Sequence, residues 1–69
     1  MSWSDMLESW ASKRLLKGED HILNNATPIF ESTMIKAALK VTKGKKSEAA
    51  KLLGWGRNTL ARKITELDL

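Results

Sequence analysis

The sequence predicts an all-α fold of four helices in one small domain, and three observations support this prediction. Apolar residues recur at three- and four-residue spacing along most of the 69-residue chain, which is the periodicity of an amphipathic helix. No segment alternates apolar and polar residues as a half-buried strand would. Segments of helical periodicity end at Gly18, Gly44 and Gly54, and glycine commonly ends helices.

The first predicted helix runs from Ser4 to about Lys17. Ser4 is a suitable N-cap, because a serine hydroxyl can accept a hydrogen bond from a backbone N–H of the first turn. The apolar residues at helical spacing are Trp3, Leu7 and Trp10. Gly18 ends this helix, and residues 19–26 are expected to form a connection with at most a short turn of helix.

The second predicted helix has Thr27 as its cap and Pro28 at its first position, where the missing N–H costs nothing. It runs to about Thr42 or Lys43 and stops at Gly44. Its apolar residues cover roughly 200° of the helix circumference; they are Phe30, Met34, Ile35, Ala37, Ala38, Leu39 and Val41. A helix so widely apolar usually packs against two neighbours, and we expect the second neighbour to be another copy of this chain.

The third predicted helix is short and covers about residues 46–53. Its alanines, Ala49 and Ala50, permit the close approach of a crossing helix. Gly54 supplies the left-handed backbone conformation that ends this helix. Trp55 follows the turn, and we expect its side chain to fill the core between the helices.

The fourth predicted helix begins at about Arg57 or Asn58 and runs to Leu67. Its inward stripe consists of Leu60, Ile64 and Leu67. The third and fourth helices are joined by a tight turn at Gly54, which is the arrangement of a helix-turn-helix. Such a motif places its second helix in the major groove of DNA.

Base readout is expected from three side chains of the fourth helix: Arg57, Asn58 and Arg62. A guanidinium can donate two hydrogen bonds to guanine, and a carboxamide can pair with adenine. Two alternatives stay open, since Asn58 is also a good N-cap and Arg62 can pair with Glu66 one turn further on. Phosphate contacts are expected from Lys45, Lys46, Ser47, Thr59 and Lys63.

The charge is unevenly distributed along the chain. Residues 40–69 hold eight Lys and Arg against three acidic residues, whereas residues 1–39 hold four against five. This polarity suits a polyanion-binding surface, although a solvated lysine-rich face would have the same charge. We therefore divide one compact domain into a helical dimerisation region, residues 1–43, and a helix-turn-helix DNA-binding region, residues 44–69. The expected dimer interface consists of Trp3, Leu7, Trp10, Phe30, Met34, Ile35, Ala38 and Leu39.

The composition argues against several other classes of protein. The chain has no Cys and one His, and we find no catalytic constellation, phosphate loop or metal-ligand spacing. The sequence therefore predicts no enzymatic activity, no metal and no cofactor. No basic leader and no apolar stretch of roughly 20 residues is visible, so we expect a cytoplasmic protein without a membrane anchor.

Residues 44–67 resemble the Fis-type helix-turn-helix family. Within them, Leu-Leu-Gly-Trp-Gly-Arg-Asn-Thr-Leu at residues 52–60 is most similar to the C-terminal domains of response regulators that activate nitrogen-regulated genes. The similarity reaches back to the Trp-containing first helix.

This resemblance implies a homodimer in which the first two helices of each chain form a four-helix bundle. It also implies that Arg57, Asn58 and Arg62 read enhancer-like DNA sites. Activation would involve RNA polymerase with an alternative sigma factor, through receiver and ATPase domains that lie upstream of this region. A helical dimerisation or adaptor module that binds polyanions only loosely stays open as the alternative.

Overall fold

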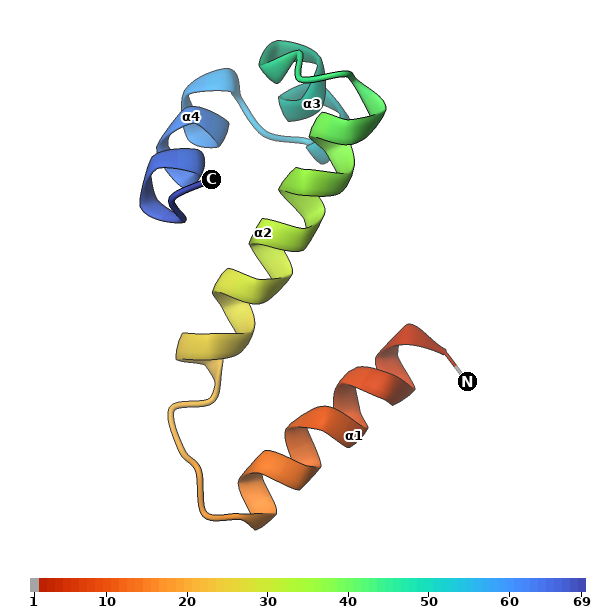
Figure 1. Ribbon diagram of the computed structural model, residues 1–69, viewed down its shortest axis with the longest axis vertical. Coiled ribbons are helices and arrows are strands. Elements are labelled where there is room, and N and C mark those ends of the chain that lie inside the picture. Colours follow the sequence, from red (N-terminus) through yellow and green to blue (C-terminus); the bar gives the residue numbers. More distant parts are fainter. Residues whose placement is uncertain (1) are drawn as a thin grey trace.

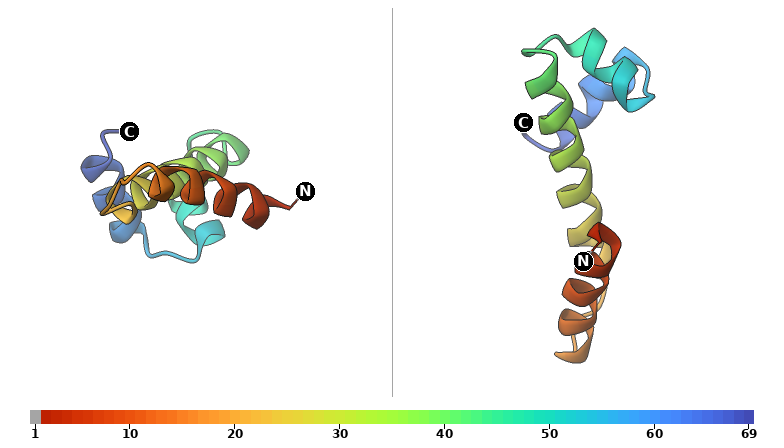
Figure 2. Two further views of the ribbon diagram at one scale, coloured as in Figure 1. Left: turned by 90° about the horizontal axis from the view of Figure 1, so that it is seen from below. Right: turned by 90° about the vertical axis from the view of Figure 1, so that its right-hand side faces the viewer.

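The computed structural model describes residues 2–69, which form four α-helices and no strand. The helices are α1 (Trp3–Leu16), α2 (Leu23–Val41), α3 (Lys46–Leu53) and α4 (Arg57–Glu66). The long helix α2 is the axis of the molecule (Figure 1). Helices α3 and α4 lie beside its C-terminal half, and α1 lies beside its N-terminal end (Figure 2). The predicted all-α fold is confirmed.

Helix α1 begins two residues earlier than predicted, because Ser2 and not Ser4 is its N-cap. The Asp5 N–H donates to Ser2 Oγ at 3.2 Å, and the Ser2 N–H donates to Asp5 Oδ2 at 3.3 Å. This reciprocal capping box needs an acidic or amide side chain three residues after the cap. Ser4 has Leu7 at that position, so the start predicted at Ser4 is wrong.

Helix α2 begins at Leu23, one turn before the predicted cap at Thr27, so Pro28 lies inside the helix. Proline has no N–H to donate to the carbonyl of Asn24, and it is unfavourable in a helix interior. Asn24 is exposed, so water can reach this carbonyl. The additional turn extends the apolar face of α2, since Leu23 and Ala26 line a groove against α1. The predicted start is therefore wrong.

The buried core joins the C-terminal half of α2 to α3 and α4. Its fully or nearly buried residues are Ile35, Ala38, Ala49, Ala50 and Leu60. Leu39, Leu53, Trp55, Ile64 and Leu67 pack against them. The predicted inward stripe of α4 and the predicted role of Trp55 are thus confirmed, whereas α1 contributes no buried residue.

Helix α2 has two apolar faces with different neighbours. Ile35 is 0% exposed and Ala38 is 8% exposed, and both lie in the core of their own chain. Phe30 and Met34 remain exposed on the side that lines the groove against α1. Since Ile35 and Ala38 have almost no surface left for a second chain, we leave them out of the dimer surface proposed below. Leu39 packs against the same core.

The turn between α3 and α4 has the predicted left-handed glycine. Gly54 has φ +80°, and the Trp55 N–H donates to the carbonyl of Ala50 at 2.9 Å across the end of α3. This bond satisfies one of the carbonyls left free at the helix terminus. Residues 2–69 contain no helix with the length and hydropathy of a membrane span.

Candidate nucleic-acid interface

The outward face of α4 follows from the burial of its inward face. Leu60 is 0% exposed and Ile64 packs against the core. On a helix with 100° per residue, Arg62 lies about 160° from both of them. Arg62 is exposed, and so is Asn58 one turn earlier on the same side. The two side chains therefore stand on the solvent face of α4.

The geometry bears on the two local alternatives for these side chains. Gly56 is the N-cap of α4, so Asn58 lies within the first turn and is not a capping residue. Arg62 does pair with Glu66, with Nε 3.6 Å from Oε1. Both side chains of this pair are more than half exposed, so solvent screens the attraction and the guanidinium can exchange partners readily.

Arg57 is the first residue of α4 and is exposed. The N-terminal residues of a recognition helix are those that contact base edges in helix-turn-helix complexes. The turn at Gly54 thus brings all three side chains onto one short helix: Asn58 and Arg62 lie opposite its buried face, and Arg57 is exposed at its N-terminal end.

The N-terminus of α3 holds three of the expected phosphate contacts. Lys45 is at the N-cap position, and Lys46 and Ser47 follow in the first turn, all of them exposed. No side chain caps this end, so its first N–H groups point to solvent. Thr59 on α4 is half-buried.

Lys63 is not placed as an exposed cation. Its Nζ lies 2.9 Å from Glu31 Oε2 and donates to Glu31 Oε1 at 3.2 Å. The Lys63 and Glu31 side chains are only 24% and 16% exposed. The expected phosphate contact at Lys63 therefore competes with an ion pair inside the chain.

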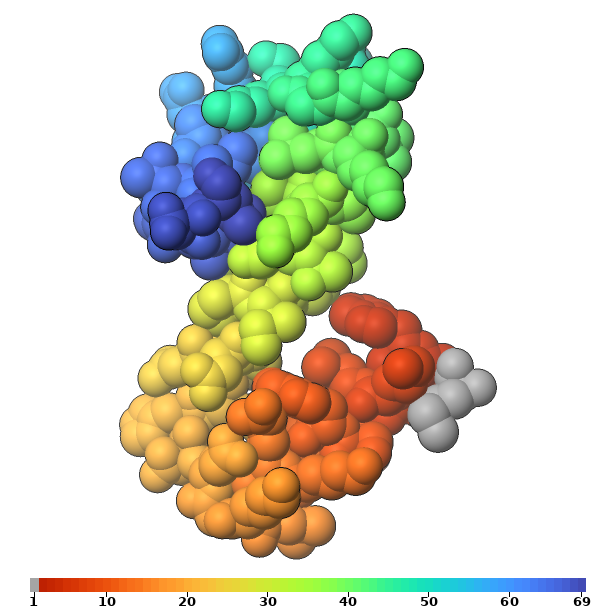
Figure 3. All heavy atoms as spheres, in the orientation of Figure 1, coloured from red at the N-terminus to blue at the C-terminus, as the bar shows by residue number. Residues whose placement is uncertain are grey.

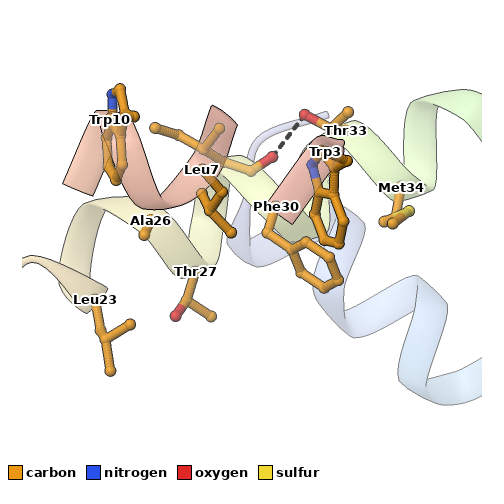
Figure 4. Close-up of a pocket in the computed structure, with 10 residues that line it drawn as sticks. Trp3, Leu7, Trp10, Leu23, Ala26, Thr27, Phe30, Thr33 and Met34 are labelled. Carbon is orange, nitrogen blue, oxygen red and sulfur yellow. Dashed lines mark hydrogen bonds between the residues drawn. The ribbon is translucent and has the colours of Figure 1, made fainter. Parts of the chain in front are cut away.

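A second feature of the surface is an apolar groove between α1 and the N-terminal half of α2, with a volume of about 490 Å³. Trp3 stacks on Phe30 with ring centroids 6.0 Å apart, although Trp3 is 62% and Phe30 46% exposed (Figure 4). Figure 3 shows a hollow between α1 (red and orange) and the yellow-green part of α2. The expected dimer residues that line this groove are Trp3, Leu7, Trp10, Phe30 and Met34.

The sequence reasoning missed part of this groove. Leu23, Ala26 and Ile29 also line it, and Leu23 and Ile29 are exposed. Their three-residue spacing was a helical signal, but Asn24-Asn25 and the Thr27-Pro28 pair favoured a loop before residue 27.

Acidic and imidazole side chains do not gather into a metal site within residues 2–69. His21 has one carboxylate beside it, Asp20 Oδ1 at 2.8 Å from Nδ1, and both side chains are at least three-quarters exposed. This pair lies in the connection between α1 and α2.

The family comparison and the comparison with curated proteins both match this chain to bacterial regulatory proteins. The family model described as "Bacterial regulatory protein, Fis family" matches residues 27–67. The chain is 52% identical over 67 residues to the DNA-binding transcriptional regulator NtrC of Proteus hauseri. It is 48% identical over 68 residues to the proteins of that name from Escherichia coli (strain K12) and Klebsiella pneumoniae. These alignments cover 97–99% of the chain but only 14% of each relative. No solved structure matches the chain.

Proposed function

This chain belongs to the Fis family of bacterial regulatory proteins, and we propose that it binds double-stranded DNA sequence-specifically, as a homodimer and without enzymatic activity. The observation that supports this proposal best is the solvent face of α4, where Asn58 and Arg62 lie opposite the buried Leu60. Arg57, Asn58 and Arg62 are the proposed base-reading residues. Lys45, Lys46, Ser47 and Thr59 are the proposed phosphate contacts.

The similar proteins are named DNA-binding transcriptional regulators, and the chain matches their C-terminal region. We propose that this chain is the DNA-binding part of an activator of nitrogen-regulated genes in the cytoplasm. Contact with RNA polymerase and its alternative sigma factor belongs, in this proposal, to receiver and ATPase domains outside the 69 residues. This region needs only to select the site and to hold two copies together.

The proposed homodimer rests on the apolar surface that the single chain leaves exposed. α1 contributes no buried residue, and the large apolar side chains of the groove remain in contact with solvent. Contiguous apolar surface of this kind usually marks an interface. In the proposed dimer, α1 and the N-terminal half of α2 from each copy form a four-helix bundle, with Phe30 and Trp3 near its centre.

Phe30→Asp tests the dimer directly. Because Phe30 lies outside the core of the single chain, we expect this variant to stay folded but to sediment as a monomer at micromolar concentration, where the parent chain is a dimer. Leu52→Asp is the matched control, since Leu52 is equally apolar and is exposed on α3, away from the groove. It should remain a dimer. A dimeric Phe30→Asp variant would contradict the proposed interface.

Selection of duplexes from a random DNA library by the purified chain tests the function. We expect two related half-sites with centres about 34 Å apart, which is one turn of the double helix. Binding to the selected duplex should be at least about 10³-fold tighter than binding to a scrambled duplex at the same salt concentration. Equal affinity for both duplexes would favour the alternative, a helical dimerisation or adaptor module that binds polyanions loosely.

A further inference from the structure

One ion pair joins α4, which carries the proposed base-reading residues, to α2, which carries part of the proposed dimer surface. Lys63 on α4 and Glu31 on α2 are 32 residues apart in sequence, and Lys63 Nζ reaches both carboxylate oxygens of Glu31, at 2.9 and 3.2 Å. Every other ion pair within residues 2–69 links residues at most five positions apart. Lys63–Glu31 is therefore the long-range ionic contact of the described chain.

The pair lies at the edge of the core. Glu31 is one helical turn before Ile35 on α2, and Lys63 is one turn after Leu60 on α4. Ile35 and Leu60 are the largest fully buried side chains of residues 2–69. The ion pair thus extends the contact between α2 and α4 by one turn, toward the half of α2 that lines the apolar groove. Figure 1 shows α4 beside the C-terminal half of α2.

Apolar contacts at Leu60, Ile64 and Leu67 hold α4 against the core, but apolar packing is non-directional. The ion pair adds a contact of defined geometry between α4 and α2, since Lys63 Nζ lies within 3.2 Å of both carboxylate oxygens of Glu31. Arg57 lies about 9 Å along the helix axis from Lys63, at a rise of about 1.5 Å per residue. A change of tilt at Lys63 is therefore transmitted to the residues that face DNA.

We propose that Lys63 and Glu31 are positioning residues that set the direction of α4 relative to the dimerisation surface, and with it the separation of the two recognition helices. This inference rests on the proposed function. Glu31 is next to Phe30 in sequence, so the pair connects α4 to the same helix that presents the dimer surface. Lys63 then acts through Glu31 and does not neutralise a phosphate.

The burial of both side chains makes the pair sensitive to substitution in this proposal. The two side chains are 24% and 16% exposed, so removal of one partner leaves the other charge partly desolvated without its counter-ion. The unpaired side chain then moves toward water, and α4 keeps its apolar contacts with the core but loses its ionic contact with α2.

The experiment compares Lys63→Met, Glu31→Gln and the reciprocal double variant Lys63→Glu with Glu31→Lys. Each is measured on the duplex selected by the parent chain and on duplexes whose centre is one or two base pairs longer or shorter. We expect each single variant to reduce the preference for the selected spacing about tenfold, and the reciprocal variant to restore most of it. Circular dichroism and sedimentation verify that the variants are folded dimers.

Salt dependence separates positioning from phosphate contact. A lysine that neutralises a phosphate contributes roughly 0.9 to the slope of log affinity against log salt, or about 1.8 for a dimer. We expect Lys63→Met to leave this slope unchanged. Glu31→Gln should weaken binding to the selected spacing, whereas a freed phosphate-binding lysine would strengthen it.

Two results would overturn this inference while the proposed function stands. One is a shallower salt slope for Lys63→Met with equal loss on every spacing, and the other is an unchanged spacing preference in both single variants. If the parent chain itself does not distinguish selected from scrambled duplexes, the proposed function fails.

Discussion

Arg62→Ala is expected to weaken binding to the selected duplex by about 2–6 kcal/mol for a symmetric dimer, since each bidentate contact to a base contributes about 1–3 kcal/mol of discrimination. Binding to a scrambled duplex should change much less, because a non-specific complex uses phosphate contacts in place of base contacts. Fluorescence anisotropy titrations of both duplexes at one salt concentration measure the two losses. The fold should be unaffected, since the Arg62–Glu66 pair is largely exposed.

Lys43→Ala is the matched control for this experiment. Lys43 is an exposed cation in the turn after α2, outside the proposed base-reading face. Its removal should weaken binding to both duplexes alike and make the salt dependence shallower. Equal losses on both duplexes for Arg62→Ala would contradict base readout by this residue and favour loose polyanion binding.

Leu60→Ala is expected to lower the free energy of unfolding by about 2–5 kcal/mol, the range for a large-to-small substitution in a packed core. Leu60 is 0% exposed and anchors α4 to α2 and α3. A chain of 69 residues has a thin core, so a loss of this size removes much of its stability. Urea denaturation followed by circular dichroism measures the change.

Leu52→Ala provides the comparison, because Leu52 is 65% exposed on α3. A surface substitution of this kind usually changes the free energy of unfolding by less than about 0.5 kcal/mol. If Leu60→Ala were as mild as Leu52→Ala, α4 would not depend on this core contact, and the rigid outward face on which base readout relies would be in doubt.

The helix-turn-helix was predictable almost to the residue, because short-range signals determine it. The predicted third helix, residues 46–53, and the left-handed Gly54 are both found in the structure. The inward stripe of Leu60, Ile64 and Leu67 follows from helical periodicity alone. Within this segment, glycine placement and apolar spacing agree on the same local structure.

The helix starts near the N-terminus were less predictable, because nearby signals compete there. Ser2 and Ser4 are both capping residues, and only the partner at Asp5 decides between them. At α2, the Thr27-Pro28 pair is a strong start signal, yet the helix begins at Leu23, where an extra turn lengthens the apolar face along the groove. The preference of individual residues for a helix start is weak compared with the free energy gained by packing an apolar face.

The sequence by itself determined the four amphipathic segments, the glycine turn and the excess of positive charge in residues 40–69. Only the tertiary structure decided that Ile35 lies in the core of its own chain while Phe30 remains open, and that Lys63 meets Glu31. The physical reason is that periodicity specifies which residues share a helix face. The neighbour that each face meets depends on how the helices pack, which involves residues far apart in the chain.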